Sequence, residues 1–179
     1  MASVQLHDFP PDQLDAIVSW RNDNEVNQFL RPGMRTQEQV QTWYDETFST
    51  ASNRLFAIYH DHDLIGYASI EDIDVINQSC EFGIVIGNQQ YWRQGIGKTV
   101  IKNMLEMAFT QLAMHRVMAR IHDGNTASIN CFTRSGFQFE GRHREAKYVN
   151  GKYVDLLFYA ILESEWRRLS SREPHMMEC

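Results

Sequence analysis

The chain has 179 residues, 43% of them hydrophobic and 22% charged, a composition typical of a globular domain with a sizeable core. It contains neither a run of about 18 apolar residues nor a secretion signal, and its three unclustered cysteines suggest neither disulfides nor zinc, so we expect a cytoplasmic protein without a membrane span. The net charge of −6 argues against nucleic acid as the main partner and favours a cationic or amine substrate.

The first part of the chain predicts a short strand and then two helices separated by a polar loop. Pro10-Pro11-Asp12 is a typical helix start, and apolar residues follow it at helical spacing. Thr36-Gln-Glu-Gln39 has the spacing of a capping box and predicts a second helix through Phe48. The loop of residues 22–35 between the two helices is a candidate for a wall that selects the substrate.

A β-hairpin is expected next along the chain. Residues 55–59 and 64–70 predict its two strands, with a turn at His60-Asp-His-Asp63 between them. Histidine beside aspartate can bind a metal, but nothing fixes ligand geometry in this segment. We therefore interpret it as a solvated turn and predict no metal site. Residues 72–78 predict a further turn.

The segment from Glu81 to Val100 predicts a strand, a glycine loop and a helix in that order. Phe82–Ile86 is the strand, Gly87 and Asn88 end it, and Gln94-Gly-Ile-Gly-Lys98 opens a helix with one apolar face. The first N–H groups of a helix have no partner within it, its dipole favours an anion, and glycines let a phosphate come close to the backbone. This segment therefore predicts a phosphate site.

Two nucleotide-binding motifs with glycine loops do not fit the segment. Gly95-Ile-Gly97 lacks the third glycine of the dinucleotide fingerprint and the acidic residue that binds ribose. Lys98 follows Gly97, but no glycine stands five positions before Gly97, as a P-loop requires. An ordinary glycine-bearing turn remains the alternative to a phosphate site.

The rest of the chain predicts strands and helices in alternation. The expected elements are strands at residues 115–121, 137–141, 146–149 and 153–162, a helix at 126–134 and a helical turn at 163–169. Gly136 predicts the C-terminal cap of the helix, and Asn150-Gly151 is a strong hairpin signal. We expect a single domain over residues 1–169 and a disordered tail over residues 170–179.

Three motifs make the chain resemble one enzyme superfamily. They are Trp92-Arg-Gln-Gly-Ile-Gly97, Asn125-Thr-Ala-Ser128 and Ser135-Gly136-Phe137. With the order of the predicted elements, they resemble the GNAT superfamily of acetyl-CoA-dependent N-acetyltransferases, in the branch that holds spermidine, ribosomal-protein N-terminal and amino-sugar acetyltransferases. This resemblance implies an α/β fold of mixed α+β type. Its central twisted sheet would be mostly antiparallel, with splayed strands and with helices on both faces.

The resemblance also implies that acetyl-CoA is the co-substrate and that the glycine loop binds its pyrophosphate. The expected cofactor-binding residues of the loop are Arg93, Gln94, Gly95, Ile96, Gly97, Lys98 and Thr99. Pantetheine would lie between the strand at 83–86 and the strand at 116–121, against the backbone of Ile84, Val85 and Ile86. Asn125, Ser128 and Phe132 of the following helix would contact the cofactor from its other side.

The chain departs from the family at the expected general acid. Many relatives carry a tyrosine four residues before the glycine of the Gly-Phe pair, whereas this chain has Phe132, which cannot donate a proton. Tyr148 and Tyr153 are other candidate donors.

Three residues are candidates for the base that takes the proton of the amine. They are, in order, Glu81, Glu71 and His122. The alternative for Glu81 is a cross-strand ion pair, and the alternative for His122 is a structural role.

These expectations give a leading hypothesis and two alternatives. In the first, the protein moves the acetyl group of acetyl-CoA to a primary amine of a small molecule, a polyamine or an amino sugar, by direct attack of the amine on the thioester. The alternatives are acetylation of a protein N-terminus and a coenzyme-A-binding module with little catalysis. We expect neither nucleic acid nor a membrane as a partner, and the formation of a homo-oligomer is left open.

Overall fold

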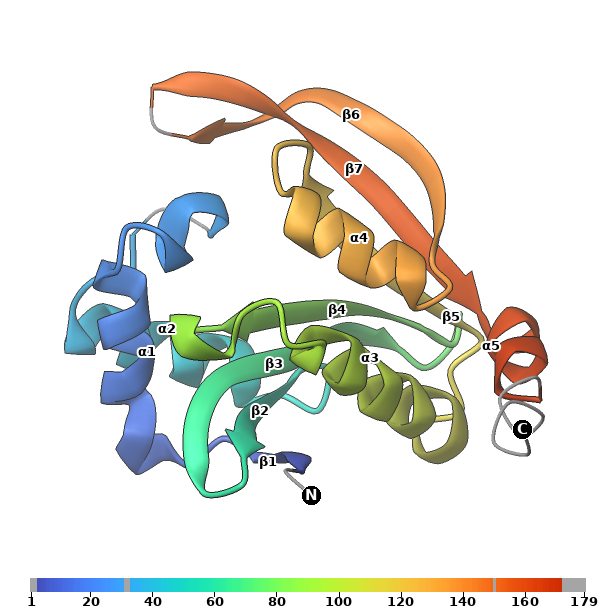
Figure 1. Ribbon diagram of the computed structural model, residues 1–179, viewed down its shortest axis with the longest axis horizontal. Helices are drawn as coiled ribbons and strands as arrows, with labels where there is room; N and C mark the ends of the chain where they lie inside the picture. Colours follow the sequence, from blue (N-terminus) through green and yellow to red (C-terminus); the bar gives the residue numbers. More distant parts are fainter. Residues whose placement is uncertain (1–2, 31–32, 150, 172–179) are drawn as a thin grey trace. The chain divides into compact units, whose positions relative to one another are not determined.

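The computed structural model describes residues 3–30, 33–149 and 151–171, and Figure 1 shows their helices and strands. The chain divides into two compact units, each built from two stretches of sequence. The first unit comprises Met1–Ile73 and Phe82–Val100, and the second comprises Asp74–Glu81 and Ile101–Cys179. Among the described residues, no helix is both long and apolar enough to cross a bilayer.

The first unit contains the predicted hairpin and the two helices that precede it. Its elements are β1 (Val4–Asp8), η1 (Pro11–Gln13), α1 (Leu14–Asn22), η2 (Val26–Phe29), α2 (Gln37–Phe48), β2 (Arg54–His60), β3 (Asp63–Asp74) and η3 (Gln89–Tyr91), with the end of β4 (Ser79–Ile86) and the start of α3 (Ile96–Glu106). Strand β2 pairs antiparallel with both β1 and β3.

The capping box predicted for the second helix is present at the start of α2. The backbone N–H of Gln39 donates to Oγ1 of Thr36 at 3.3 Å, and the backbone N–H of Thr36 donates to Oε1 of Gln39 at 3.2 Å. Each side chain thus satisfies an N–H group that the helix itself leaves without a partner. The helix ends at Phe48, as predicted.

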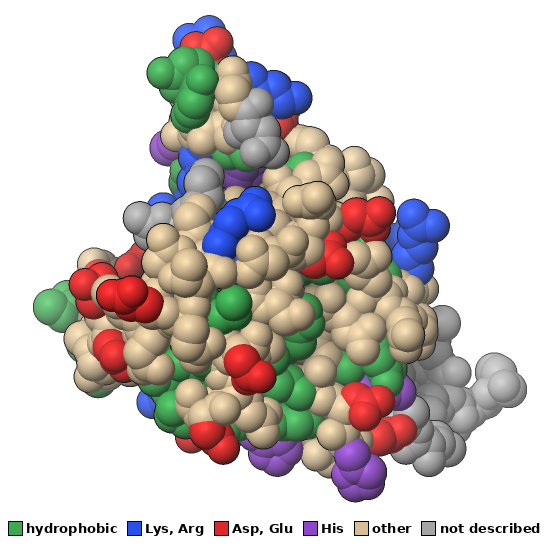
Figure 2. Space-filling view, turned by 90° about the vertical axis from the view of Figure 1, so that its left-hand side faces the viewer, with side chains coloured by type: hydrophobic (Ala, Val, Ile, Leu, Met, Phe, Trp, Pro, Cys, Tyr) green, Lys and Arg blue, Asp and Glu red, His purple; other side chains and the backbone are tan. Residues whose placement is uncertain are grey.

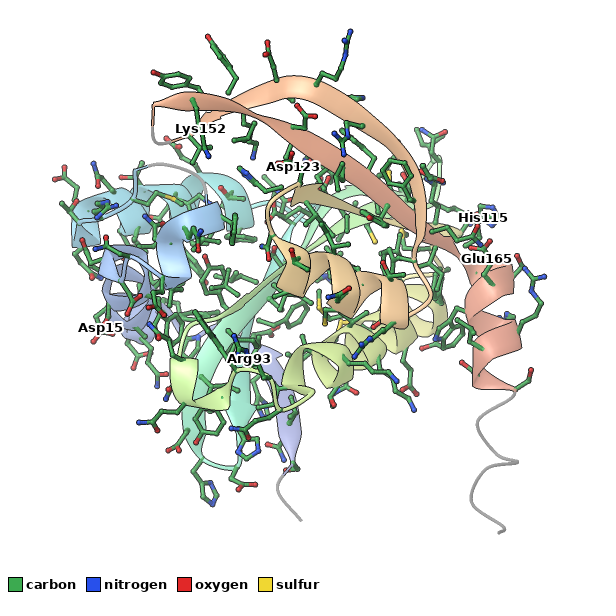
Figure 3. The ribbon with its side chains drawn as sticks, turned by 45° about the horizontal axis from the view of Figure 1, so that its top comes forward. Asp15, Arg93, His115, Asp123, Lys152 and Glu165 are labelled. Carbon is green, nitrogen blue, oxygen red and sulfur yellow. The ribbon has the colours of Figure 1, made fainter. Side chains whose placement is uncertain are left out.

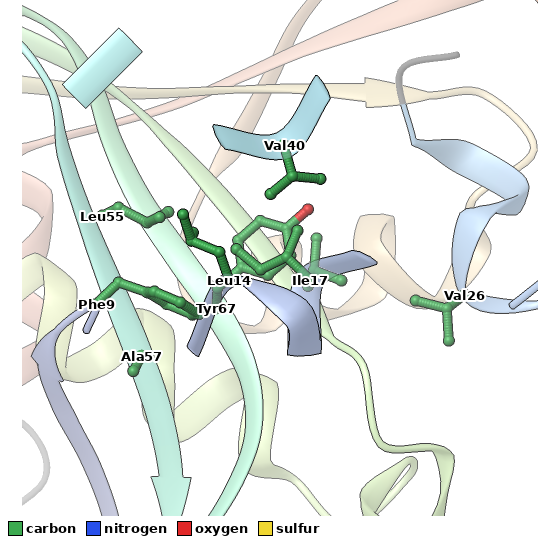
Figure 4. Close-up of a cluster of buried hydrophobic side chains, with 9 residues drawn as sticks. Phe9, Leu14, Ile17, Val26, Val40, Leu55, Ala57 and Tyr67 are labelled. Atoms are coloured by element: carbon green, nitrogen blue, oxygen red, sulfur yellow. The ribbon is translucent and has the colours of Figure 1, made fainter. Parts of the chain in front are cut away.

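Apolar side chains of α1, α2 and the strands form the core of the first unit (Figure 4). The buried members of this cluster are Phe9, Leu14, Ile17, Val26, Val40, Leu55, Ala57, Tyr67 and Val85. Because Tyr67 and Val85 come from β3 and β4, the helices cover the part of the sheet that leads into the glycine loop. Removing this apolar area from water stabilises the arrangement, at about 25 cal/mol per Å².

Strand β3 is longer than the sequence predicts. The turn expected from residue 72 begins only after Asp74. The backbone N–H of Asp72 donates to Oδ1 of Asn53 at 2.9 Å, and that of Ile73 donates to the carbonyl of Ser52, also at 2.9 Å. These partners lie far back in the sequence, so no local pattern around residue 72 indicates them.

The second unit holds the remaining strands and helices. They are the end of α3 with a π-helical segment (Met107–Gln111), β5 (Arg116–His122), α4 (Thr126–Arg134), β6 (Gln138–Val149), β7 (Lys152–Leu162) and α5 (Glu163–Ser170). Strand β4 pairs in parallel with β5 over Ser79–Glu81, and it therefore begins before the predicted residue, Phe82. Strand β7 pairs antiparallel with β5 and with β6.

Strand β6 is one irregular strand, whereas two were predicted. Its register with β7 shifts between His143 and Lys147. Across this shift, Asp155 of β7 accepts a hydrogen bond from the backbone N–H of Glu145 at 2.8 Å and pairs with Arg142 at 3.1 Å. These two contacts hold the irregular part of β6 to its neighbour.

Helix α5 includes Ser170, the first residue of the predicted tail. Residues 172–179 and the predicted hairpin residue Asn150 lie outside the described residues.

The seven strands follow the order β1-β2-β3-β4-β5-β7-β6. The prediction of an α+β fold with a mostly antiparallel sheet is confirmed, with β4–β5 as the parallel pair. The β4–β5 pairing ends at Glu81 and Met118. The splay of the strands beyond that point and the single domain over residues 1–169 stay predictions.

Candidate functional site

The glycine loop follows directly from the end of β4, in the first unit. The N–H groups of Gly87 and Asn88 both donate to the carbonyl of Ile65, at 2.8 and 2.9 Å. The indole Nε1 of Trp92 donates to the carbonyl of Ile86 at 2.7 Å. The chain is therefore held where it leaves the sheet, and the loop starts from a fixed position.

Two residues of the glycine loop have positive φ values, a feature of backbone loops that bind anions. Arg93, which Figure 3 labels, and Gly95 are both left-handed, with φ of 62° and 78°. Alternation of left- and right-handed residues turns successive N–H groups toward one side, which favours an anion there. Helix α3 begins at Ile96, and its first N–H groups have no intrahelical partner.

The predicted cofactor-binding residues of this loop lie together in one continuous turn. The side chains of Arg93, Gln94, Lys98 and Thr99 are exposed, whereas Ile96 is buried and anchors the turn to the protein. Gly95 has no atom within 4 Å of the position that a Cβ would occupy, so its open side is free of protein atoms. The residues present therefore fit the phosphates of acetyl-CoA, through backbone donors and one or two cations.

Backbone of β4 leads into the loop at Ile84, Val85 and Ile86. Val85 is buried in the core of the first unit, and Ile84 and Ile86 are half-buried. A Cβ at Gly66 of β3 would lie 2.2 Å from the carbonyl oxygen of Val85, so only a glycine allows the two strands to come this close. Contact of this backbone with pantetheine stays a prediction.

The carboxylate of Glu71 lies near the same part of β4. It accepts a hydrogen bond from Oγ of Ser69 at 2.6 Å, and its Oε1 is 3.7 Å from the position that a Cβ at Gly83 would occupy. Glu71 is partly exposed, whereas Ser69 is buried. The second candidate base thus lies beside the backbone that enters the glycine loop.

A buried polar pair lies close to Glu71. Arg21 of α1 is only 5% exposed, and Tyr67 of β3 is equally buried. Burial raises the pKa of the Tyr67 hydroxyl, the positive charge of Arg21 acts against this rise, and the negative charge of Glu71 adds to it. Because these charges act on one hydroxyl, Arg21, Tyr67 and Glu71 form one electrostatic cluster.

Ser69, Tyr67 and Arg21 were not singled out from the sequence, although these polar residues are grouped with Glu71 in the structure. One signal was available: Arg21 follows Ile17 by four positions and so lies on the apolar face of α1. A second was the alternation of Tyr67, Ser69 and Glu71 along β3, which places three polar groups on one face of the strand.

The first candidate base, Glu81, belongs to the second unit and is held in an ion pair. Nε of Arg120 on β5 lies 2.8 Å from its Oε1 and 2.7 Å from its Oε2. This is the cross-strand ion pair that the sequence left open as the alternative. A catalytic role for Glu81 stays a prediction, and it would require this pair to rearrange.

The third candidate base, His122, ends β5 and is buried in the second unit. Burial and the charge of Lys147 lower its pKa, and the charge of Asp123 opposes this shift. The imidazole is therefore neutral at neutral pH, the form that accepts a proton. Its role as a base stays a prediction.

The other predicted cofactor contacts lie on α4. The side chain of Asn125 caps this helix by accepting the N–H of Ser128 at 3.1 Å. Phe132 is buried and packs edge-to-face on Phe137, with ring centroids 4.9 Å apart. The structure thus brings Asn125 and Ser128 together through a hydrogen bond and places Phe132 against another ring.

Other groups singled out in the sequence lie at the surface. The rings of Tyr148 and Tyr153 are 5.0 Å apart, and both side chains are mostly exposed. In the predicted turn, Nδ1 of His60 is 3.9 Å from Asp61. No set of three or more His, Cys, Asp or Glu side chains in the described part of the chain has the arrangement of a metal site.

Comparison with known proteins links this arrangement to a family. A family model described as the acetyltransferase (GNAT) domain matches residues 4–138. A Bacillus subtilis protein named provisionally as a ribosomal N-acetyltransferase, YdaF, is 32% identical over 109 residues, which cover 61% of this chain and 59% of that protein. Spermidine N(1)-acetyltransferase from Vibrio cholerae is 25% identical over 146 residues, 81% of this chain and 84% of that enzyme.

The fold is also that of a solved acetyltransferase. The crystal structure of spermidine N-acetyltransferase from Vibrio cholerae, in complex with CoA and spermine, superposes with a TM-score of 0.84. The superposition covers 92% of this chain and 98% of that one, at 23% sequence identity. At this identity the structural similarity establishes the fold but does not identify the acceptor amine.

Proposed function

The chain belongs to the GNAT acetyltransferase domain family, and we propose that it transfers the acetyl group of acetyl-CoA to a primary amine of a small molecule, a polyamine or an amino sugar. The resemblance predicted from the sequence is confirmed by the family match. With it, the protein is an N-acetyltransferase that uses acetyl-CoA as co-substrate.

The observation that carries the proposal is the glycine loop at the N-terminus of α3. Left-handed Arg93 and Gly95 present backbone donors just before a helix whose first N–H groups are unsatisfied. Lys98 adds a positive charge on the exposed side. Such a site suits the pyrophosphate of coenzyme A, and it lies directly after the strand expected to bind pantetheine.

The reaction needs a neutral amine near the thioester, an acceptor for its proton and donors for the developing oxyanion. We assign the donors to backbone N–H groups near Val85 or Ile86. The proton acceptor is one of Glu81, Glu71 and His122. Phe132 supplies no acid. The departing sulfur is therefore protonated by another donor, such as Tyr148 or Tyr153, or by water, or the thiolate leaves unassisted.

A small cationic acceptor is supported by charge and by relatives. The net charge is −6, and Figure 2 shows Asp and Glu side chains distributed over the face on which α1 and α2 lie. A surface with this balance attracts polyamines and repels anions. One relative with 84% of its length aligned is named as a spermidine acetyltransferase, which is consistent with a polyamine.

The second candidate function is acetylation of a protein N-terminus. The relative YdaF, named as a ribosomal N-acetyltransferase, is 32% identical over the part that aligns. A peptide backbone needs an open groove, and the segment between α1 and α2 would line or block it. The third candidate is a coenzyme-A-binding module with little catalysis, which Phe132 in place of the family's acid permits.

One experiment separates the three functions. Purified protein is incubated with acetyl-CoA and polyamines, amino sugars or N-terminal peptides, and release of the free thiol is measured. We expect turnover with a small amine and at most slow turnover with peptides. The reverse preference would support N-terminal acetylation. Thermal stabilisation by coenzyme A without turnover on any acceptor would indicate a binding module and refute the proposed activity.

A further inference from the structure

Ser69 and Glu71 form a hydrogen-bonded pair beside β4. Oγ of Ser69 donates to Oε1 of Glu71 at 2.6 Å, within the short range of hydrogen bonds to carboxylates. Ser69 is only 4% exposed, whereas Glu71 is partly exposed. Within the described part of the chain, this is the one side-chain hydrogen bond that the carboxylate of Glu71 makes.

A glycine on β4 makes room for this pair. A Cβ at Gly83 would lie 2.5 Å from Oγ of Ser69, closer than real Cβ atoms approach another atom. Any larger residue at 83 would therefore displace the serine hydroxyl. Gly83 directly precedes Ile84–Ile86, the backbone that we expect to contact pantetheine. The carboxylate of Glu71 lies beside Gly83, with Oε1 3.7 Å from the position of a Cβ there.

The buried neighbours of Glu71 restrict where its carboxylate can move. Arg21 and Tyr67 are each 5% exposed, and the charges of Arg21 and Glu71 both act on the Tyr67 hydroxyl. Val85, on the same side of β4 as Gly83, belongs to the apolar cluster with Tyr67. The carboxylate thus lies at a border between buried groups and solvent, which favours one fixed orientation.

Glu81 differs from Glu71 in its partner. Both of its oxygens are within 2.8 Å of Nε of Arg120. An ion-paired carboxylate is a weaker proton acceptor, because protonation would break the pair. The side-chain partner of Glu71 is instead the hydroxyl of Ser69, which donates a hydrogen bond and orients the carboxylate.

From this geometry we propose that Glu71 is the base that takes the proton of the acceptor amine, and that Ser69 is the positioning residue that orients it. The inference rests on the proposed N-acetyltransferase function. The neutral amine attacks the thioester carbon, so a C–N bond forms and the C–S bond breaks. One proton passes from the nitrogen to the carboxylate of Glu71, and the thiolate leaves. When that proton is released to solvent and the thiolate takes up a proton, the products are the amide and coenzyme A, and Glu71 is again ionised.

The test is a double-mutant cycle on the full chain, measured by single-turnover acetylation of the best acceptor. Glu71→Gln keeps the shape of the side chain and removes its basicity, and it should lower the rate by about 100-fold or more. Ser69→Ala should lower it by about tenfold, and Ser69→Thr, which keeps the hydroxyl, should recover part of that loss. In the Glu71→Gln background, Ser69→Ala should change the rate by less than about twofold, because no base remains to be oriented.

Matched controls separate chemistry from folding and binding. Glu106→Gln alters an exposed carboxylate on α3 and should leave the rate unchanged. Glu81→Gln should lower the single-turnover rate less than Glu71→Gln does. The thermal shift produced by coenzyme A should be the same in the wild-type protein and in the Ser69 and Glu71 variants.

Specific results would overturn the inference. If Glu71→Gln keeps more than about half of the wild-type rate, Glu71 is not the base. If Ser69→Ala costs the same factor with and without Glu71, Ser69 has only a structural role. These results would leave the proposed function standing, because that function fails only if the wild-type protein itself acetylates no small-molecule amine or prefers peptides.

Discussion

The indole of Trp20 occupies the space that a side chain at Gly87 would need. A Cβ at Gly87 would lie 2.1 Å from Cδ2 of Trp20 and 2.3 Å from its Cγ. Trp20 also stacks on Tyr67, with ring centroids 6.2 Å apart and an interplanar angle of 23°. Helix α1 is therefore packed against the residue at which β4 turns into the glycine loop.

We predict that Gly87→Ala destabilises the protein because the new methyl group must displace a large aromatic ring. Overpacking of this kind costs about 1–3 kcal/mol. Urea unfolding at 25 °C measures the difference. The matched control is Gly141→Ala, because a Cβ there meets no atom within 4 Å. Equal stability of the two variants would show that Trp20 moves aside at little cost.

We predict that Gly97→Asp removes the thermal stabilisation produced by coenzyme A. Gly97 is the second residue of α3, where a carboxylate suits the helix dipole, so the fold should persist. The same carboxylate would repel the pyrophosphate. At a ligand concentration of 100 times Kd, the wild-type protein should gain about 2.7 kcal/mol, and the variant should gain almost none.

Gly97→Asn is the control for charge, since its side chain has nearly the same shape. It should retain more coenzyme A binding than Gly97→Asp. If the aspartate variant is stabilised as much as the wild-type protein, the loop is a structural turn and the phosphates bind elsewhere.

We predict that Phe132→Tyr raises the single-turnover rate by up to about tenfold, because it restores an acid toward the departing thiolate. The hydroxyl would enter a buried site, where an unpaired group costs about 1–3 kcal/mol, so the free protein should also lose stability. Stopped-flow detection of the thiol measures the rate. A slower reaction together with weaker coenzyme A binding would contradict the prediction and show that the phenyl ring matters for its shape.

We predict that His122 makes the fold sensitive to acid. Its pKa in the folded protein is lower than the ordinary value of 6.5, chiefly because the imidazole is buried and secondarily because of Lys147. As pH falls below 6.5, the unfolded chain binds a proton at this residue before the folded chain does. Stability should therefore be highest above pH 6.5 and should fall until the folded pKa is reached.

The test is urea unfolding of the wild-type protein and of His122→Gln between about pH 7.5 and pH 5. Comparing the two proteins isolates the contribution of His122 from that of the other histidines. The difference between their free energies of unfolding should shrink as pH falls. Lys147→Met should weaken the pH dependence of the wild-type protein by removing one cause of the low pKa. A difference that stays constant with pH would contradict the assignment.

The sequence alone determined the features that depend on near neighbours in the chain. Thr36 and Gln39 form the predicted capping box, and α4 runs from Thr126 to Arg134, as its spacing and the breakers on each side indicate. The glycine loop between β4 and α3 was equally clear. Hydrogen bonds within one turn and the conformational freedom of glycine decide these features, and both are local properties.

Only the tertiary structure decided which candidate groups have partners. Glu81 and Arg120 are 39 positions apart, and their ion pair depends on the register between β4 and β5. The sequence shows that Ser69 and Glu71 alternate along β3. That Gly83 leaves space for Ser69 depends on the pairing of β3 with β4. The length of β3 likewise depends on Asn53, which is 19 positions from Asp72. Strand register and burial set these contacts, and periodicity along the sequence encodes neither of them.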